Sequence, residues 1–170
     1  MGCVNVIFLD VDGVLNDYET KEKNPNGNTG IDDDKVKRLS QIASYLKAEI
    51  VLTSSWKFEF EEKDVHPDYD YLVKKLGKYN LKIKGNTQDM VFDRGHGILT
   101  WIRQQSLFDR DVDKFIILDD REFEYDLNPG IPEHVILTDA HEGGIMRMRA
   151  MVEKPAREVT DVLEYCRGGY

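Results

Sequence analysis

The sequence lacks the features that mark secreted, zinc-bound and membrane proteins. Its 170 residues include only two cysteines, Cys3 and Cys166, too few for a disulfide framework or a cysteine-ligated zinc site. No apolar run approaches the ~18 residues that a membrane-spanning helix needs. The N-terminus also lacks the basic start of a signal peptide. We therefore expect a cytoplasmic protein with no membrane partner.

The sequence also has fewer basic than acidic residues. The chain has 23 Lys and Arg against 32 Asp and Glu, which gives a net charge of −9 at pH 7. Such a protein repels nucleic acid and anionic lipid on average, so only a local basic patch would attract them. No basic stripe with interleaved aromatic residues is present, and nothing in the sequence indicates an obligate protein partner.

The apolar residues fall in short segments that are rich in β-branched side chains. Continuous runs of this kind are typical of strands that are buried on both faces of a parallel sheet. We expect such strands at residues 4–9, 49–53, 114–118 and 134–138, with a weaker candidate at 81–84.

Helical patterns lie between these segments. The clearest is an apolar stripe over residues 36–46, behind three aspartates at 32–34 that suit a helix N-terminus. We also expect helices at 68–79, at 96–105 and from about Pro155 onward, with Lys35, Lys37 and Arg38 on a solvated helix face and with Met146, Met148 and Met151 packing within a helix.

Strands that alternate with helices predict the fold class. We expect an α/β protein, a three-layer Rossmann-like domain with a mostly parallel central sheet flanked by helices. Residues 1–170 are expected to form this one domain, with a polar flap at 16–30, a small irregular insertion at 56–93 and no large cap domain. Sheets of this kind bind ligands at the carboxyl ends of their strands.

Acidic and hydroxyl side chains follow the predicted strands where each one ends. Carboxylates that converge on one sheet edge repel each other unless a cation lies between them. A hard, oxygen-seeking ion such as Mg²⁺ meets that need and commonly accompanies a phosphate. The residues concerned are Asp10, Asp12 and Gly13 after the first strand, Thr53, Ser54 and Ser55 after the second, and Asp119 and Asp120 after the fourth.

Each of these motifs alone has an ordinary interpretation as a turn, a helix cap or a polar loop. Their joint occurrence, each directly after a buried strand, predicts a Mg²⁺ and phosphate site. Gly13 lets the chain turn sharply there, and the hydroxyls of Ser54 and its neighbours can donate to phosphate oxygens.

Three of these stretches resemble a known family. "FLDVDGVLN", "IVLTSSW" and "FIILDDR" are similar to the first, second and fourth motifs of the haloacid dehalogenase (HAD) superfamily of phosphohydrolases. The resemblance spans about residues 4–121. An aspartate at position 12 is what the family's phosphatases have and its dehalogenases lack, so the resemblance implies phosphate chemistry.

The resemblance also implies roles for the four aspartates. Asp10 would be the nucleophile that forms an aspartyl-phosphate. Asp12 would be the general acid for the leaving oxygen and then the base for the hydrolytic water. The Mg²⁺ ligands would be the Asp10 side chain, the Asp12 backbone carbonyl and the pair Asp119 and Asp120, and the resemblance leaves open which of that pair binds directly.

Phosphate binding needs a hydroxyl and a cation as well. Ser54 aligns best with the family's phosphate-binding hydroxyl, with Thr53 as the alternative and Ser55 and Gly13 beside them. The third motif of the family supplies a Lys or Arg near the start of the helix before the fourth motif. Arg94 is the better candidate for that cation, because a helix N-terminus attracts anions, and Lys84 is its competitor.

The expected function is a Mg²⁺-dependent phosphatase that hydrolyses a phosphomonoester. A site without a large cap is open to a nucleotide, a polynucleotide end or a phosphoprotein. The motifs are similar to those of HAD domains attached to nucleic-acid end-repair enzymes, although the net negative charge weighs against that substrate. The alternatives are a phosphotransferase or mutase of the same superfamily, a catalytically silent phosphate-binding module and a receiver-like phosphoacceptor.

Overall fold

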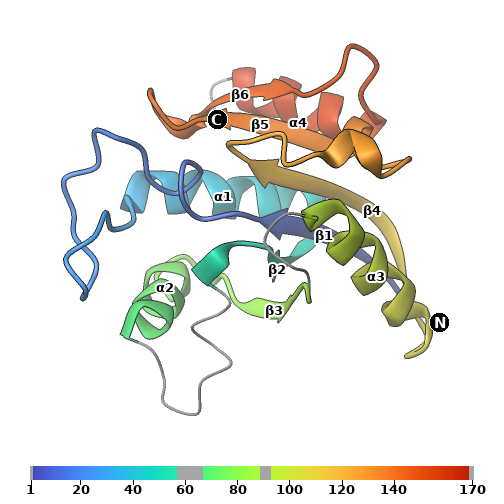
Figure 1. Ribbon diagram of the computed structural model, residues 1–170, viewed down its shortest axis with the longest axis horizontal. Helices are drawn as coiled ribbons and strands as arrows, with labels where there is room; N and C mark the ends of the chain where they lie inside the picture. The colour runs from blue at the N-terminus through green and yellow to red at the C-terminus, as the bar shows by residue number, and fades with distance from the viewer. Residues whose placement is uncertain (1, 57–66, 89–92, 169–170) are drawn as a thin grey trace.

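A computed structural model describes residues 2–56, 67–88 and 93–168 and contains one six-stranded sheet (Figure 1). The strands are β1 (Gly2–Leu9), β2 (Ala48–Leu52), β3 (Ile83–Asn86), β4 (Arg110–Asp119), β5 (Val135–Asp139) and β6 (Gly144–Ala150). The helices are α1 (Asp33–Leu46), α2 (Pro67–Gly77), α3 (Arg94–Ser106) and α4 (Arg157–Arg167), with short 3-10 helices η2 (Tyr125–Leu127) and η3 (Pro132–His134).

The order of the strands across the sheet is β3-β2-β1-β4-β5-β6. The pairs from β3 to β5 are parallel, and β6 runs antiparallel to β5. The strand order therefore reverses direction between β1 and β4, which is where sheets of this kind bind their ligands.

Both faces of the sheet are covered by helices, as the continuous apolar runs predicted. Because side chains alternate along a strand, successive residues of β1 enter opposite layers. Ile7 and Leu9 join the hydrophobic cluster that includes α1, α2 and α4. Val6 and Phe8 join the cluster that includes α3, and Phe8 meets the Trp101 ring edge-on. The predicted three-layer α/β fold is confirmed, and the described residues form no large cap domain.

The strand β6 was not predicted from the sequence. Residues 146, 148 and 151 were expected to pack within a helix, and that expectation is wrong, because Met146 and Met148 lie on β6. Met148 packs against the core, whereas Arg147 and Arg149 are exposed. This alternation of apolar and charged residues is that of a half-buried edge strand, whose charges discourage pairing with another chain.

The segment 16–30 lies against α2 (Figure 1). The Glu22 carboxylate accepts hydrogen bonds from Tyr71 Oη at 2.7 Å and from Lys75 Nζ at 2.6 Å. Tyr71 Oη also accepts from the Ile31 backbone N–H at 2.9 Å. Hydrogen bonds to α2 therefore hold the predicted flap at its middle, at Glu22, and just after its end, at Ile31.

A second anchor of this segment is a buried ion pair. Lys35 Nζ lies 3.0 Å from Asp17 Oδ2, with both side chains at most 10% exposed, and also pairs with Asp32. Lys35 was expected on a solvated helix face, and that expectation is wrong because its partners come from the loop before α1.

Of the predicted insertion at 56–93, residues 57–66 and 89–92 lie outside the described part of the chain. The part that is described contains α2 and β3, and β3 extends the sheet beside β2. Among the helices that the structure describes, none has the length and apolar character needed to cross a bilayer.

Candidate active site

The sheet register brings three sequence-predicted positions into one row. Leu9 of β1 is paired with Leu52 on one side and with Leu118 on the other. The next residue of each strand continues this ladder: Asp10 N–H donates to the Leu118 carbonyl, and Thr53 N–H donates to the Leu9 carbonyl, both at 2.9 Å. Thr53, Asp10 and Asp119 therefore lie side by side at the carboxyl edge of the sheet.

Three carboxylates gather at this edge. One oxygen each of Asp10, Asp119 and Asp120 lies within 4.8 Å of the others. Asp10 is 4% exposed and Asp119 is fully buried. Such a cluster is unstable without positive charge, since burial strengthens the repulsion between carboxylates.

Arg94 supplies part of that charge. Its Nη1 lies 3.1 Å from Asp10 Oδ1 and 2.8 Å from Asp119 Oδ2, and its side chain is 7% exposed. Burial alone would lower the pKa of the guanidinium, but Asp10 and Asp119 outweigh burial and raise it, so Arg94 stays charged.

One guanidinium does not balance the three acids. Burial, followed by the repulsion of Asp119, raises the pKa of Asp10 well above its usual range. Burial also raises the pKa of Asp119 to about 6, although Arg94 and Tyr125 act to lower it. Burial likewise raises the pKa of Asp120. The cluster therefore calls for additional positive charge at neutral pH.

Arg94 is held in place from three directions. It is the first residue of α3, whose N-cap residue Asp93 accepts a hydrogen bond from His96 N–H at 3.0 Å. The guanidinium carbon lies 4.0 Å from the centroid of the Phe123 ring, a cation–π contact. Tyr125 Oη donates to Asp119 Oδ2, the oxygen that Arg94 also contacts, at 2.7 Å.

Asp12 has a different environment from Asp10. It is exposed, and each of its oxygens accepts one hydrogen bond at 3.0 Å, Oδ1 from Asn16 Nδ2 and Oδ2 from Trp56 Nε1. Asn16 Oδ1 in turn accepts from Gly13 N–H at 2.8 Å, which closes the turn after β1. These donors fix the direction of the Asp12 carboxylate while leaving it open to solvent.

Gly13 makes room for Asp120. Its φ of +77° lies in the left-handed region, which favours glycine. A β-carbon at this position would lie 2.4 Å from Asp120 Cγ. The glycine of the first motif is therefore needed for the conformation of the turn and for the position of an acid from the fourth motif.

The three hydroxyls after β2 differ in what surrounds them. Thr53 Oγ1 is buried and has no hydrogen-bond partner among the described residues. Ser54 Oγ is buried and accepts from Trp56 N–H at 3.3 Å, whereas Ser55 is exposed. A buried polar atom without a partner is uncommon and indicates a site for a ligand atom. On this ground Thr53, the predicted alternative to Ser54, is at least as well placed to bind a phosphate oxygen.

The competing cation Lys84 lies elsewhere. It is exposed on β3, two strands away from β1, and no ion pair of its side chain is found among the described residues. The contacts to Asp10 and Asp119 belong to Arg94.

The residues at the edge fit a Mg²⁺ ion. The cluster offers hard carboxylate oxygens, which Mg²⁺ prefers. Asp119 already accepts from Arg94, Tyr125 and the Arg121 N–H, whereas the one ion pair of Asp120 found among the described residues is a 3.9 Å contact with Arg121 Nε. Asp120 therefore keeps more of its oxygen lone pairs available to a metal.

Three residues that shape the site were not predicted from the sequence. Asn16 and Trp56 orient Asp12, and Tyr125 supports Asp119. Trp56 lies 44 residues from Asp12 in the sequence, so only the folded sheet brings them together. Asn16 lies four residues after Asp12 within the first motif, so its amide was the one feature of the sequence that could have indicated a hydrogen bond to Asp12.

A family model confirms the resemblance. The model described as "HAD domain in Swiss Army Knife RNA repair proteins" matches residues 6–145, which is most of the chain and includes the three stretches that carry the resemblance. No curated protein and no solved structure gave a match.

Proposed function

The chain belongs to the HAD domain family of Swiss Army Knife RNA repair proteins, and on that basis we propose that it is a Mg²⁺-dependent phosphatase that hydrolyses a terminal phosphomonoester on a polynucleotide. The family's description supports RNA as the polynucleotide. Both cysteines are free, which favours a reducing compartment such as the cytoplasm for this activity.

The observation that carries the proposal is the contact of Arg94 with both Asp10 and Asp119. Arg94 engages Asp10 through Oδ1, and among the described residues no donor engages Oδ2. One oxygen of the buried acid is therefore available for attack, while a fixed cation lies beside it. This arrangement suits an anionic transition state, because the charge that stabilises it is already in position.

In the first step, Asp10 Oδ2 attacks the phosphorus of the monoester. The bond between phosphorus and the leaving oxygen breaks, and Asp12 gives its proton to that oxygen. Asn16 and Trp56 keep the Asp12 carboxylate aimed for this transfer. Arg94 and the Thr53 hydroxyl face the oxygens of the transferring group.

In the second step, water attacks the phosphorus of the aspartyl-phosphate on Asp10. Asp12, now a base, takes a proton from that water, and the bond between phosphorus and Asp10 breaks. Inorganic phosphate leaves, and both acids return to their starting states. When bound by Asp10, Asp120 and their neighbours, Mg²⁺ supplies the neutralising charge that lets a carboxylate approach an anionic phosphate.

The test is phosphate release from phenyl phosphate and from 3′- and 5′-phosphorylated oligoribonucleotides, in Mg²⁺ or in EDTA. Asp10→Asn keeps the size of the side chain and removes the nucleophile, so it should abolish release. Asp34→Asn is the matched control, because Asp34 is exposed in the first turn of α1 and is not one of the clustered acids.

Asp12→Asn distinguishes hydrolysis from simple binding. Loss of the base slows the second step, so the variant should accumulate a phosphoryl group on Asp10, which mass spectrometry of the peptide would detect. Release that persists in Asp10→Asn, or a folded wild type that is inactive with every substrate, would refute the proposed function.

A further inference from the structure

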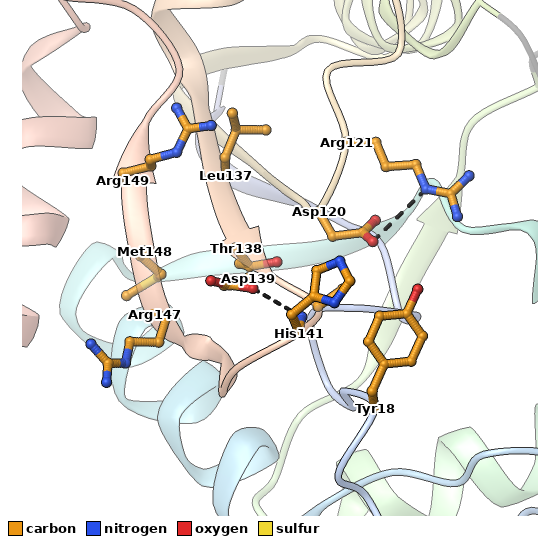
Figure 2. Close-up of a pocket in the computed structure, with 11 residues that line it drawn as sticks. Tyr18, Asp120, Arg121, Leu137, Thr138, Asp139, His141, Arg147, Met148 and Arg149 are labelled. Carbon is orange, nitrogen blue, oxygen red and sulfur yellow. Dashed lines mark hydrogen bonds and ion pairs between the residues drawn. The ribbon is translucent and has the colours of Figure 1, made fainter.

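A pocket of about 540 Å³ opens beside Asp120, within the range of ligand-binding pockets (Figure 2). Its lining comes from the end of β5, from the loop to β6 and from β6 itself, together with Tyr18 of the segment 16–30. Asp120 also lines this pocket. It is the one lining residue with a part in the proposed phosphate chemistry.

The pocket is continuous with the general acid. A smaller hollow of about 230 Å³ is lined by Asp12 and Gly13 and shares Tyr18, Asp120 and Arg121 with the larger pocket. Because Asp12 protonates the leaving oxygen, the leaving group must lie on this side of the reacting phosphorus. Whatever remains attached to that oxygen is thus directed towards the larger pocket.

Tyr18 and His141 form an aromatic pair at the mouth of the pocket. Their ring centroids are 4.8 Å apart with the planes inclined by 48°, and Tyr18 is 74% exposed (Figure 2). Because Tyr18 is so exposed, its ring contributes little to the core and is accessible to a ligand beside the catalytic edge. Tyrosine and histidine faces are surfaces on which unpaired bases stack.

The backbone under this pair is fixed. Tyr18 N–H donates to the Ala140 carbonyl at 3.0 Å, and His141 N–H donates to Asp139 Oδ1 at 2.9 Å. Thr138 Oγ1 donates to the Gly13 carbonyl at 2.7 Å, which ties β5 to the first motif. The pair is therefore held at a set distance from the reacting centre.

Three arginines line this pocket although the whole chain is acidic. Arg121, Arg147 and Arg149 line the pocket against two carboxylates, Asp120 and Asp139. Arg147 is paired with Glu142, at 3.0 Å, whereas the Arg149 side chain has no ion pair within the described ranges. Arg149 lies on the far side of the pocket from Tyr18 (Figure 2), so it can take a second anion.

From these observations we propose that the pocket is a nucleotide subsite for single-stranded polynucleotide ends. The base next to the reacting phosphate stacks on Tyr18 and His141, and Arg149 binds the next internucleotide phosphate. This inference rests on the proposed function and adds to it the reason for a polynucleotide rather than a small phosphate ester. Arg149, which has no ion pair within the described ranges, gives a local attraction for a phosphate although the net charge of the chain is negative.

The test compares kcat/KM for three substrates: phenyl phosphate, a nucleoside monophosphate and a dinucleotide with the same terminal phosphate, each nucleotide offered in 3′- and 5′-phosphorylated forms. Tyr18→Ala should lower the nucleotide-to-phenyl-phosphate ratio by about tenfold, the scale of one lost base–aromatic stack. Arg149→Ala should lower the dinucleotide-to-mononucleotide ratio and reduce its dependence on salt. The substrate whose ratio responds identifies the end that is recognised.

Matched controls lie away from the pocket. Phe108 is 72% exposed before β4, at the amino ends of the strands, and Arg103 is exposed on α3. Phe108→Ala and Arg103→Ala should leave both ratios at the wild-type values.

Several outcomes would separate this inference from the proposed function. Ratios that are unchanged in Tyr18→Ala, with hydrolysis that still requires Asp10, would overturn the subsite and leave the phosphatase standing. A phosphotyrosine peptide that is hydrolysed better than every oligonucleotide, and that responds to Tyr18→Ala, would replace the nucleotide by a peptide. If nothing is hydrolysed, the phosphatase fails, and the subsite then depends on whether Tyr18→Ala weakens binding of a fluorescent oligonucleotide, measured by anisotropy.

Discussion

The carboxylate of Asp120 lies directly over Gly13, so close that a β-carbon on residue 13 would be 2.4 Å from Asp120 Cγ. The glycine of the first motif and the second acid of the fourth motif are thus one steric unit. A side chain added at position 13 must therefore displace Asp120.

We predict that Gly13→Ala loses both stability and metal affinity. The left-handed backbone costs about 1–2 kcal/mol with a side chain, and the displaced Asp120 no longer shares a cation with Asp10. Urea unfolding measures the first effect, and the Mg²⁺ concentration needed for half-maximal activity measures the second.

Gly27→Ala separates the two effects. Gly27 has a similar φ of +84° but nothing lies within 4 Å of an added β-carbon. This control should lose a comparable stability and keep the Mg²⁺ requirement of the wild type. An unchanged Mg²⁺ requirement in Gly13→Ala as well would show that Asp120 does not depend on the glycine.

Lysine should replace Arg94 only in part. Arg94 reaches Asp10 and Asp119 through one nitrogen, Nη1. Its planar group also lies over the Phe123 ring, a contact that the compact ammonium of lysine does not reproduce. We predict that Arg94→Lys and Arg94→Ala both lower kcat for phenyl phosphate, the alanine variant by about 10²- to 10³-fold. Arg103→Ala, on the exposed side of the same helix, is the control, and wild-type turnover in Arg94→Lys would contradict the prediction.

The fold was largely predictable because each central strand is a continuous apolar run. Strands buried on both faces need no alternation, and β1, β2, β4 and β5 have this pattern. The edge strand β6 was missed for the opposite reason. Its half-buried residues alternate with arginines over a short length, and the three methionines were assigned to a helix instead.

The residues of the candidate site were predictable where they directly follow a strand, because the ends of parallel strands meet at one edge of the sheet. Asp10, Thr53 and Asp119 become neighbours through the sheet register alone. The partners of Asp12 and Lys35 were not predictable, because they depend on where distant loops come to rest. No local pattern at Trp56 indicates a hydrogen bond to an acid 44 residues earlier.

Removing the Asp120 carboxylate should stabilise the protein without Mg²⁺ and make it less stable than the wild type with Mg²⁺. Without Mg²⁺, Asp120→Asn should be more stable than the wild type, since burial and repulsion raise the pKa values of the clustered acids. With Mg²⁺ at about 100 times its Kd, the wild type should gain about 2.7 kcal/mol and the variant less. Thermal unfolding with and without Mg²⁺ measures both.

The control for this experiment lies on β4, the strand that ends just before Asp120. Asp113 is exposed near the start of β4, far from the edge, so Asp113→Asn should respond to Mg²⁺ as the wild type does. Equal Mg²⁺ stabilisation of Asp120→Asn and the wild type would exclude Asp120 as a ligand.

The buried pair of Lys35 and Asp17 should control how stability changes with pH. Burial acts to raise the pKa of Asp17, but the hydrogen bond and charge of Lys35 outweigh it and lower the pKa. A carboxyl of this kind stabilises the fold above its unfolded pKa of about 3.9, and that stability is lost as the pH falls through the lowered folded value.

We predict that Lys35→Met inverts this behaviour. Asp17 stays buried without its cation, so its pKa rises above the unfolded value and the fold loses about 3–5 kcal/mol at pH 7. The loss should shrink as acid protonates Asp17, so the difference in unfolding free energy between wild type and variant narrows from pH 7 to pH 4. Urea unfolding across that range measures it. Lys37→Met, exposed on the same helix, should follow the wild type at every pH, and a constant difference for Lys35→Met would mean that Lys35 acts by packing and not by its charge.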